Sequence, residues 1–242
     1  MSRTSKQNRK RRRGRRQGAP LAIWGVVGLL LIAALAGFIV QSQRSDSSGH
    51  AVVTPAVASG PDGGVLEGKA SAPVLVDEYG DFTCPICRDF QATMGPTISR
   101  LVQQGTVRFN YHPIALLAQN GQDPAQAANA ALSAGDVSPA DFWKLHDALF
   151  ANQEPEGAGR WTAQYLLDLG HSLGIDSPAY DQGVTGGKYL GFVNQITQQA
   201  QQRGVDATPT IYINGQLQQD PAVITSPAAF EAAVTHAAQV NR

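Results

Sequence analysis

Residues 80–87 read GDFTCPIC and hold the only two cysteines of the 242-residue chain, Cys84 and Cys87. The preceding residues 73–79 (PVLVDEY) are a short apolar run with strand character. The following residues 85–104 are amphipathic and begin with a proline, which the first turn of a helix tolerates. The pattern therefore predicts that both cysteines lie where a strand passes into a helix.

A cysteine at that position gains a particular chemistry. The Cys84 thiol is expected to lie over the free N–H groups of the first helical turn, where the helix dipole favours negative charge. Its pKa should then fall from about 8.5 into the range of roughly 3.5–7.5. Cys84 becomes a nucleophile and a good leaving group, while Cys87, one turn further in, resolves the mixed disulfide. Pro85 and Ile86, between the cysteines, are expected to tune the redox couple.

Two structural interpretations compete with this redox pair. An inert disulfide that closes so small a loop would add little stability. A metal site would need further ligands, and the five histidines are scattered without ligand spacing. Two cysteines also exclude a framework of several structural disulfides. We therefore expect a redox pair, with no metal and no cofactor.

The rest of the domain alternates between strand and helix patterns. Residues 106–111 alternate as a half-buried strand does. The helices predicted next, with Pro and Gly at their breaks, are 124–134, 139–151, 162–173, 178–183 and 188–203. Gly95-Pro96 is expected to kink or interrupt the helix over 85–104. The helical block is an insertion over about residues 113–203.

A strand, a hairpin and a helix are predicted to close the domain. Residues 210–213 read TIYI, and Asn214-Gly215 is a strong two-residue hairpin signal into 216–219. A final helix is predicted over 227–240, with Ser226 as its cap. The order of elements predicts an α/β layered domain with a helical insertion.

The N-terminal region has a different composition. Residues 21–40 (LAIWGVVGLLLIAALAGFIV) carry no charge, and about 20 such residues span a bilayer as one helix. Residues 1–20 contain nine of the nineteen basic residues, and cationic residues stay on the cytoplasmic side. We predict a basic cytoplasmic arm over 1–20, a transmembrane signal-anchor over 21–40, a flexible Ser/Gly/Ala/Pro linker over 41–64, and an extracytoplasmic domain over 65–242.

Alternatives remain for this region. One alternative is that residues 21–40 form a buried core helix, but a core helix of this length would usually carry a polar face. A secretory peptide cleaved near Ala34-Leu35-Ala36 stays open, although the apolar run continues beyond it. Arg15-Arg16 is only a weak twin-arginine export signal in so basic a tract. Each exported form places the domain outside the cytoplasm.

The basic arm could bind nucleic acid, but the simpler interpretation is a topology determinant that also contacts anionic lipid headgroups. After residue 16, ten basic residues remain against nineteen acidic ones, a net charge of −9. This charge argues against nucleic acid as a partner of the folded domain.

Four segments together resemble a known family. They are residues 72–76 (APVLV), 80–87 (GDFTCPIC), 187–189 (GKY) and 204–215 (GVDATPTIYING). Over residues 65–242 the chain resembles the DsbA-like branch of the thioredoxin superfamily, especially membrane-anchored forms of Gram-positive bacteria. The resemblance implies a thioredoxin-like fold in which Thr208-Pro209 is a cis peptide facing the disulfide, and in which the Thr208 backbone pairs with the substrate chain. The alternative is a trans proline at the start of a strand.

The resemblance also bears on Glu78 and Ile86. Glu78 lies six residues before Cys84, where related enzymes carry a buried acid that can accept the proton of the resolving thiol; burial there should raise its pKa. Asp77 is the competing candidate, and a solvent-facing strand residue without a role is the other alternative. Strongly oxidising relatives often carry His where this chain has Ile86, so its couple is expected to be less oxidising than theirs.

We therefore expect a thiol–disulfide oxidoreductase that acts on exported proteins, as an oxidant supplied by a membrane redox partner. The alternative is a reductase or isomerase driven by such a partner. A more distant alternative is a thioredoxin-fold module that binds peptides or delivers metal.

Overall fold

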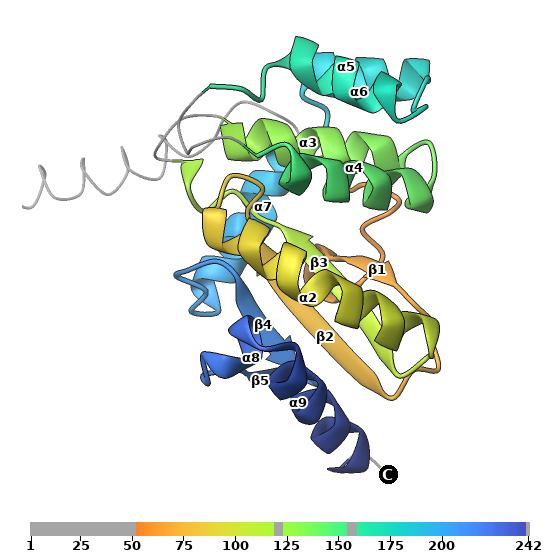
Figure 1. Cartoon of the computed structure of the whole chain (residues 1–242). Helices are drawn as coiled ribbons and strands as arrows, with labels where there is room; N and C mark the ends of the chain where they lie inside the picture. Colours follow the sequence, from red (N-terminus) through yellow and green to blue (C-terminus); the bar gives the residue numbers. More distant parts are fainter. Residues whose placement is uncertain (1–51, 119–122, 154–158, 241–242) are drawn as a thin grey trace, which may run out of the picture. The chain divides into compact units, whose positions relative to one another are not determined.

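The computed structural model describes residues 52–118, 123–153 and 159–240 (Figure 1). Its sheet has the strand order β1-β3-β2-β4-β5. The strands are β1 (Val65–Glu67), β2 (Val74–Gly80), β3 (Val107–Pro113), β4 (Thr210–Ile213) and β5 (Gln216–Leu217). The helices are η1 (Pro61–Gly63, a 3-10 turn), α2 (Pro85–Gln103), α3 (Asp123–Gly135), α4 (Pro139–Ala151), α5 (Ala163–Ser172), α6 (Pro178–Gly186), α7 (Leu190–Gln202), α8 (Ala222–Thr225) and α9 (Pro227–Val240).

Strands β2 and β3 lie inside the sheet, and together with α2 they form a β2–α2–β3 unit. β2 and β3 pair in parallel and α2 connects them, because a parallel pair needs a crossover connection. β4 pairs antiparallel with β2 on its other edge. Side chains alternate along a strand, so neighbouring residues of β2 face opposite sides of the sheet. Glu78 contacts α2 on one side, whereas Tyr79 reaches Arg203 at the end of α7 on the other.

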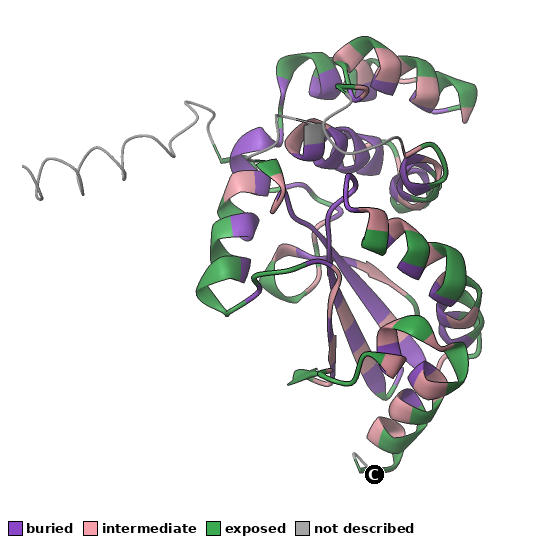
Figure 2. Cartoon of the chain, turned by 60° about the vertical axis from the view of Figure 1, so that its left-hand side comes forward, coloured by how far each residue is buried: buried purple, intermediate pink, exposed green. Residues whose placement is uncertain are grey.

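The insertion between β3 and β4 is built around α3. This helix contacts α4, α5, α6 and α7. Five of its alanines are buried, and their small side chains let neighbouring helices approach closely: Ala127, Ala128, Ala130, Ala131 and Ala134. Figure 2 shows the strands largely buried, while the outer faces of the helices are exposed. The predicted α/β layering with a helical insertion is confirmed.

One prediction about α2 was wrong in part. We expected Gly95-Pro96 to kink or interrupt the helix, but α2 is continuous from Pro85 to Gln103. Pro96 is exposed, while Met94 and Ile98 on either side of it are buried. An interior proline costs about 3 kcal/mol, and burial of the apolar face of this 19-residue helix offsets that cost.

The predicted flexible linker over 41–64 also needs correction, because its described part packs on the domain. Val57 is buried against the end of α3, where a Cβ on Gly135 would lie 2.4 Å from Val57 Cγ1. Asn110 Nδ2 of β3 donates to the carbonyl oxygen of Pro61 at 3.2 Å. The Ser/Gly/Ala/Pro composition shows no period, but the buried side chains of Pro55 and Val57 and a few hydrogen bonds hold the segment.

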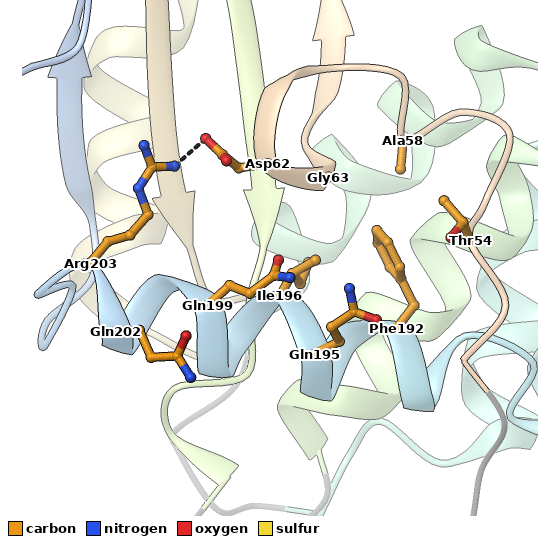
Figure 3. Close-up of a pocket in the computed structure, with 10 residues that line it drawn as sticks. All are labelled: Thr54, Ala58, Asp62, Gly63, Phe192, Gln195, Ile196, Gln199, Gln202 and Arg203. Carbon is orange, nitrogen blue, oxygen red and sulfur yellow. Dashed lines mark hydrogen bonds and ion pairs between the residues drawn. The ribbon is translucent and has the colours of Figure 1, made fainter.

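The same segment faces α7 across a hollow of about 510 Å³ (Figure 3). Thr54, Ala58 and Asp62 line one side of it, and Phe192 and Ile196 of α7 line the other. Asp62 forms an ion pair with Arg203, which closes one end of the hollow. Neither cysteine lines this hollow, so it is separate from the candidate redox site.

The predicted basic arm over 1–20 and the predicted membrane span over 21–40 lie outside the described residues. Within the ranges that the structure describes, no helix is both long and apolar enough to cross a membrane.

Candidate active site

Cys84 is the N-cap residue of α2, as the strand-to-helix pattern predicts. Its side chain is 5% exposed, and its thiol donates to the carbonyl oxygen of Thr208 at 3.3 Å. A hydrogen bond from the Cys87 thiol, joined by those from the Thr208 side chain and from the backbone N–H groups of Cys87 and Ile86, lowers the pKa of Cys84 to about 6. The neighbouring thiol thus contributes more than the free N–H groups of the helix, on which the sequence argument relied.

Cys87 lies one turn further along α2 and is fully buried. Burial, the hydrogen bond that it donates to Cys84 and the negative charge of Cys84 raise its pKa well above the ordinary value. Both cysteines are free thiols. At neutral pH the arrangement therefore favours a Cys84 thiolate beside a protonated Cys87, which is the charge state that a nucleophile and a resolving thiol need.

The loop that leads into β4 lies opposite the thiols. The Thr208-Pro209 peptide bond is cis, as the resemblance implies. Proline lacks an N–H group, so Thr208 presents its carbonyl oxygen to Cys84 without a competing donor from the next residue. This places residues 84 and 208, which are 124 positions apart in the chain, in direct contact.

Glu78 lies on the side of β2 that faces α2 and is 0% exposed. Gln91 Nε2 donates to Glu78 Oε2 at 2.7 Å. Burial raises the pKa of Glu78 to about 8, the Cys84 charge adds to this rise, and the Gln91 hydrogen bond opposes it. The alternative of a solvent-facing residue is therefore wrong.

Asp77, the competing candidate, faces the other side of the sheet. Its Oδ1 atom accepts from Asn110 Nδ2 at 2.7 Å and lies 3.2 Å from His112 Nε2. Strand alternation thus separates Asp77 from the thiols, and Glu78 is the acid of β2 that lies on the cysteine side.

The residues between the cysteines differ in exposure. Pro85 is the first residue of α2. The Ile86 side chain is 61% exposed, whereas its backbone N–H contributes to lowering the pKa of Cys84. The isoleucine side chain offers no hydrogen bond to the thiolate, so only the backbone acts on Cys84 at this position.

Sequence reasoning missed three residues at the site. Gln91 follows Cys87 by four positions, so helical spacing could have placed it on the cysteine face of α2. Tyr111 pairs in register with Glu78 on β3, and its buried hydroxyl has no hydrogen-bond partner among the described residues. Gln153, after α4, donates from Nε2 to the carbonyl oxygens of Phe82 at 2.9 Å and Cys84 at 3.0 Å. No local sequence pattern predicts the contact of Gln153 with the redox turn, because about 70 residues separate the two.

The described residues contain no group of three or more His, Cys, Asp or Glu side chains placed to hold a metal ion.

The fold and the paired thiols define a thioredoxin-type protein. A family model described as thioredoxin matches residues 61–234, and the chain belongs to that family. Within it, the chain is 30% identical over 153 residues to disulfide bond formation protein D of Bacillus subtilis, which covers 62% of this chain and 67% of that protein. It is similar at 29% identity, with a TM-score of 0.63, to the reduced form of the disulfide bond oxidoreductase DsbG from Mycobacterium tuberculosis, over 73% of this chain and 88% of that one. The protein is a DsbA-like thiol–disulfide oxidoreductase.

A third relative is similar to this chain over only a small part of its own length. The chain is 28% identical over 210 residues to the Na(+)/H(+) antiporter NhaA 3 of Salinispora tropica. The match covers 84% of this chain but only 29% of the antiporter, so the antiporter's activity is not carried over to this chain.

Proposed function

We propose that this protein is a membrane-anchored, extracytoplasmic oxidant that donates the Cys84–Cys87 disulfide to exported proteins. The observation that carries the proposal is the environment of Cys84: hydrogen bonds at the start of α2 stabilise its thiolate, and its protonated thiol donates to the Thr208 carbonyl oxygen at 3.3 Å. A stabilised thiolate favours the reduced form of the enzyme, and this makes the disulfide form an oxidant. The name of the Bacillus subtilis relative, disulfide bond formation protein D, points the same way.

The exchange proceeds in two displacements. A substrate thiolate attacks Cys84 Sγ, the Cys84–Cys87 bond breaks, and Cys87 leaves as a thiolate that takes a proton. A second substrate thiolate then attacks the substrate sulfur of the mixed disulfide, and Cys84 leaves as a stabilised thiolate. The substrate gains a disulfide, and its two electrons remain on the two enzyme thiols. A membrane redox partner would remove these electrons and restore the enzyme disulfide.

Five neighbouring residues assist these steps in the proposal. Glu78 gives the proton to Cys87 in the oxidising direction and accepts it in the reverse direction, which a carboxyl group with a pKa near 8 can do at neutral pH. Thr208 pairs through its backbone with the substrate chain, and Pro209 holds it in the cis geometry. Pro85 and Ile86 tune the couple from between the cysteines.

Ile86 favours a second candidate function. It supplies no side-chain donor to the thiolate, so the couple is expected to be less oxidising than in His-bearing relatives. A reductase or isomerase that receives electrons from a membrane partner would suit such a couple.

The reduction potential of the full-length protein, equilibrated in glutathione buffers, separates the two functions. We expect a value above about −180 mV, the potential of protein disulfide isomerase. A lower value, toward the roughly −270 mV of thioredoxin, would favour the reductase.

Trapping tests the roles of the two thiols in cells. Cys87→Ala should accumulate mixed disulfides with exported proteins, because no thiol remains to resolve the first attack. Cys84→Ala is the matched control and should accumulate none. Equal trapping by both variants would remove Cys84 as the dedicated nucleophile.

The location is proposed from the basic arm over 1–20 and the apolar segment over 21–40. The arm would stay in the cytoplasm against anionic lipid, and the domain would lie outside. Alkaline phosphatase, which is active only after export, should be active when fused to the C-terminal end. An inactive fusion that is stably produced would contradict the proposed topology.

A further inference from the structure

Cys87 must carry a negative charge at one moment of the exchange, although its surroundings oppose that charge. In the oxidising direction it leaves Cys84 as a thiolate, and in the reducing direction it attacks Cys84 as a thiolate. Its side chain is 0% exposed, and burial and the nearby negative charges disfavour the thiolate. A hydrogen-bond donor aimed at Cys87 Sγ would lower the barrier in both directions, because it acts where charge develops.

The backbone N–H of Asp81 is such a donor. Burial and two nearby negative charges raise the pKa of Cys87, whereas the hydrogen bond from the Asp81 N–H to its sulfur acts in the opposite direction. Asp81 comes directly after Gly80, the last residue of β2, so its N–H lies beyond the paired residues of that strand. It faces the first turn of α2 instead, where Cys87 lies.

The Asp81 side chain holds this peptide group in place. It is 0% exposed, and its Oδ1 atom accepts from Thr83 N at 2.9 Å and from Thr83 Oγ1 at 2.8 Å. Its Oδ2 atom accepts from Leu117 N, beyond the end of β3, at 3.0 Å. The carbonyl oxygen of Asp81 accepts from Cys84 N at 3.0 Å. Asp81 thus ties the redox turn (residues 80–87) to the segment that follows β3.

A carboxylate is matched to these donors. Burial raises the pKa of the Asp81 carboxyl group, and hydrogen bonds from Leu117, Thr83 and Leu116 oppose that rise. Both oxygens of a carboxylate accept hydrogen bonds, whereas an amide accepts on one side and donates on the other. An asparagine would therefore turn an NH₂ group toward other donors, and an alanine would leave them without an acceptor.

We propose that Asp81 acts on the leaving sulfur: its backbone N–H donates to Cys87 Sγ as that atom gains charge, and its side chain is the positioning group for this N–H. The inference rests on the proposed roles of Cys84 and Cys87 and deepens them. In the oxidising direction, a substrate thiolate forms a bond to Cys84 Sγ and the Cys84–Cys87 bond breaks. The electron pair of that bond passes to Cys87 Sγ, where the Asp81 N–H stabilises the charge until a proton is taken up.

A donor that acts only on the charged Cys87 changes rates without changing the equilibrium. At neutral pH Cys87 is bonded to Cys84 in the oxidised enzyme and is protonated in the reduced enzyme, so neither end state carries the charge. Loss of the donor should therefore slow the forward and reverse steps by the same factor and leave the reduction potential unchanged. A residue with a structural role alone would have no reason to slow both directions equally.

Asp81→Asn and Asp81→Ala test the side chain in the full-length protein. Glutathione attacks the enzyme disulfide in one direction, and Cys87 resolves the mixed disulfide with glutathione on Cys84 in the other. Acid quenching and mass spectrometry give both rate constants. Both should fall about tenfold, as expected for a lost hydrogen bond to a charged group, while the potential in glutathione buffers stays the same. Asp77→Asn, on the opposite face of β2, is the matched control and should keep the wild-type rates.

A backbone variant tests the N–H itself and keeps the side chain, which avoids the effect of the two substitutions on folding. Cell-free translation replaces residue 81 by malic acid, the α-hydroxy analogue of aspartate, so that an ester oxygen takes the place of the N–H. Both rate constants should again fall about tenfold. The ester also weakens the Gly80 carbonyl oxygen, which accepts from Ile114 N at 3.0 Å. The α-hydroxy analogue of Ile114 removes that donor instead, and it should keep the wild-type rates.

The outcomes separate the parts of the inference. Wild-type rates in the residue 81 ester would overturn the role of the N–H, and wild-type rates in Asp81→Asn and Asp81→Ala would overturn the positioning role of the side chain. A changed potential with only one rate affected would overturn both, because the group would then act on an end state. Cys87→Ala reports on the proposed function separately: if it traps no mixed disulfides, the roles of the two thiols are wrong. If it traps them and the ester reacts at the wild-type rates, only the inference about Asp81 is lost.

Discussion

At the scale of single residues, two identical side chains acquire opposite properties within one helical turn. Cys84 accepts hydrogen bonds at the start of α2, whereas Cys87 lies in the interior beside the negative charge of Cys84. Neither property belongs to cysteine itself, whose unperturbed pKa is about 8.5. The difference follows from the position of each thiol relative to the first turn of the helix and to Glu78.

This asymmetry predicts the pH dependence of alkylation. Iodoacetamide reacts with thiolates, so the rate of Cys84 modification in the reduced protein should rise through a midpoint near pH 6. Cys87 should react far more slowly over the same range, because its thiol is buried and protonated. Peptide mass spectrometry after timed quenching distinguishes the two sites. Equal labelling of both cysteines would contradict their assigned roles.

Ile86 predicts a change in redox potential. Its exposed side chain leaves room for Ile86→His, which would place a donor and a partial positive charge beside the Cys84 thiolate. The pKa of Cys84 should fall and the disulfide should become more oxidising. Stabilisation of the reduced form by about 1.4 kcal/mol corresponds to about 30 mV for this two-electron couple. Ile86→Gln, which adds a donor without the charge, is a control. An unchanged potential and pKa in Ile86→His would show that this side chain does not act on the thiolate.

At the scale of helices and strands, sequence periodicity placed the longer elements well. The structure has α4 over Pro139–Ala151, as predicted. The helix begins after Ser138, whose Oγ atom accepts a hydrogen bond from the backbone N–H of Asp141. Helix α6 was predicted to stop at Gly183 but continues to Gly186, where Gly187 adopts the left-handed conformation that ends a helix. Strand β1 and helix α8 were missed, because three or four residues are too few to show a period.

The candidate site divides in the same way. Cys84 and Cys87 follow from one short segment, because the strand-to-helix junction fixes their positions. Glu78 was predicted from the family resemblance, and the structure separates it from the competing Asp77 by strand alternation. Gln153 does not follow from a short segment, because its contact with the turn depends on how α4 packs in three dimensions. Sequence periodicity describes an element's own faces but not the partner that a distant side chain will contact.

The packed segment ahead of β1 predicts a loss of stability in one valine variant. Val57→Ala removes buried apolar surface against Gly135 and should reduce the free energy of unfolding by about 1–2 kcal/mol. Val53→Ala makes the same chemical change at a side chain that is 41% exposed and should have little effect. Urea unfolding of the full-length protein measures both. Equal midpoints for the two variants would mean that this segment does not pack on the domain in solution.

At the scale of the whole molecule, Glu78 couples the redox chemistry to stability. Its pKa is about 8 in the folded protein and near 4.5 in the unfolded chain. Between these values the folded state binds the additional proton, so the free energy of unfolding falls as the pH rises from about 4.5 to 8. Burial of Glu78 close to Cys87 therefore lowers the stability of the folded protein as the pH rises.

Glu78→Gln should remove this dependence. Relative to the wild type, the reduced variant should gain stability progressively from about pH 4.5 to pH 8, by on the order of a few kcal/mol in total. Urea unfolding at several pH values gives the difference directly. Asp77→Asn, on the opposite face of the sheet, is the matched control. A stability difference that stays constant with pH would show that Glu78 is not held protonated in the folded protein.

The two hydrogen bonds from Gln153 have a consequence for protein engineering. The helical insertion supplies the amide that holds the carbonyl oxygens of Phe82 and Cys84. A graft of residues 80–87 onto a minimal scaffold without an insertion would transfer both cysteines but not this donor. The transferred motif would keep its sequence, but its turn would lack the hydrogen bonds to the carbonyl oxygens of Phe82 and Cys84. The helical insertion and the redox turn therefore form one structural unit, and both must be transferred to another scaffold if the redox activity is to be kept.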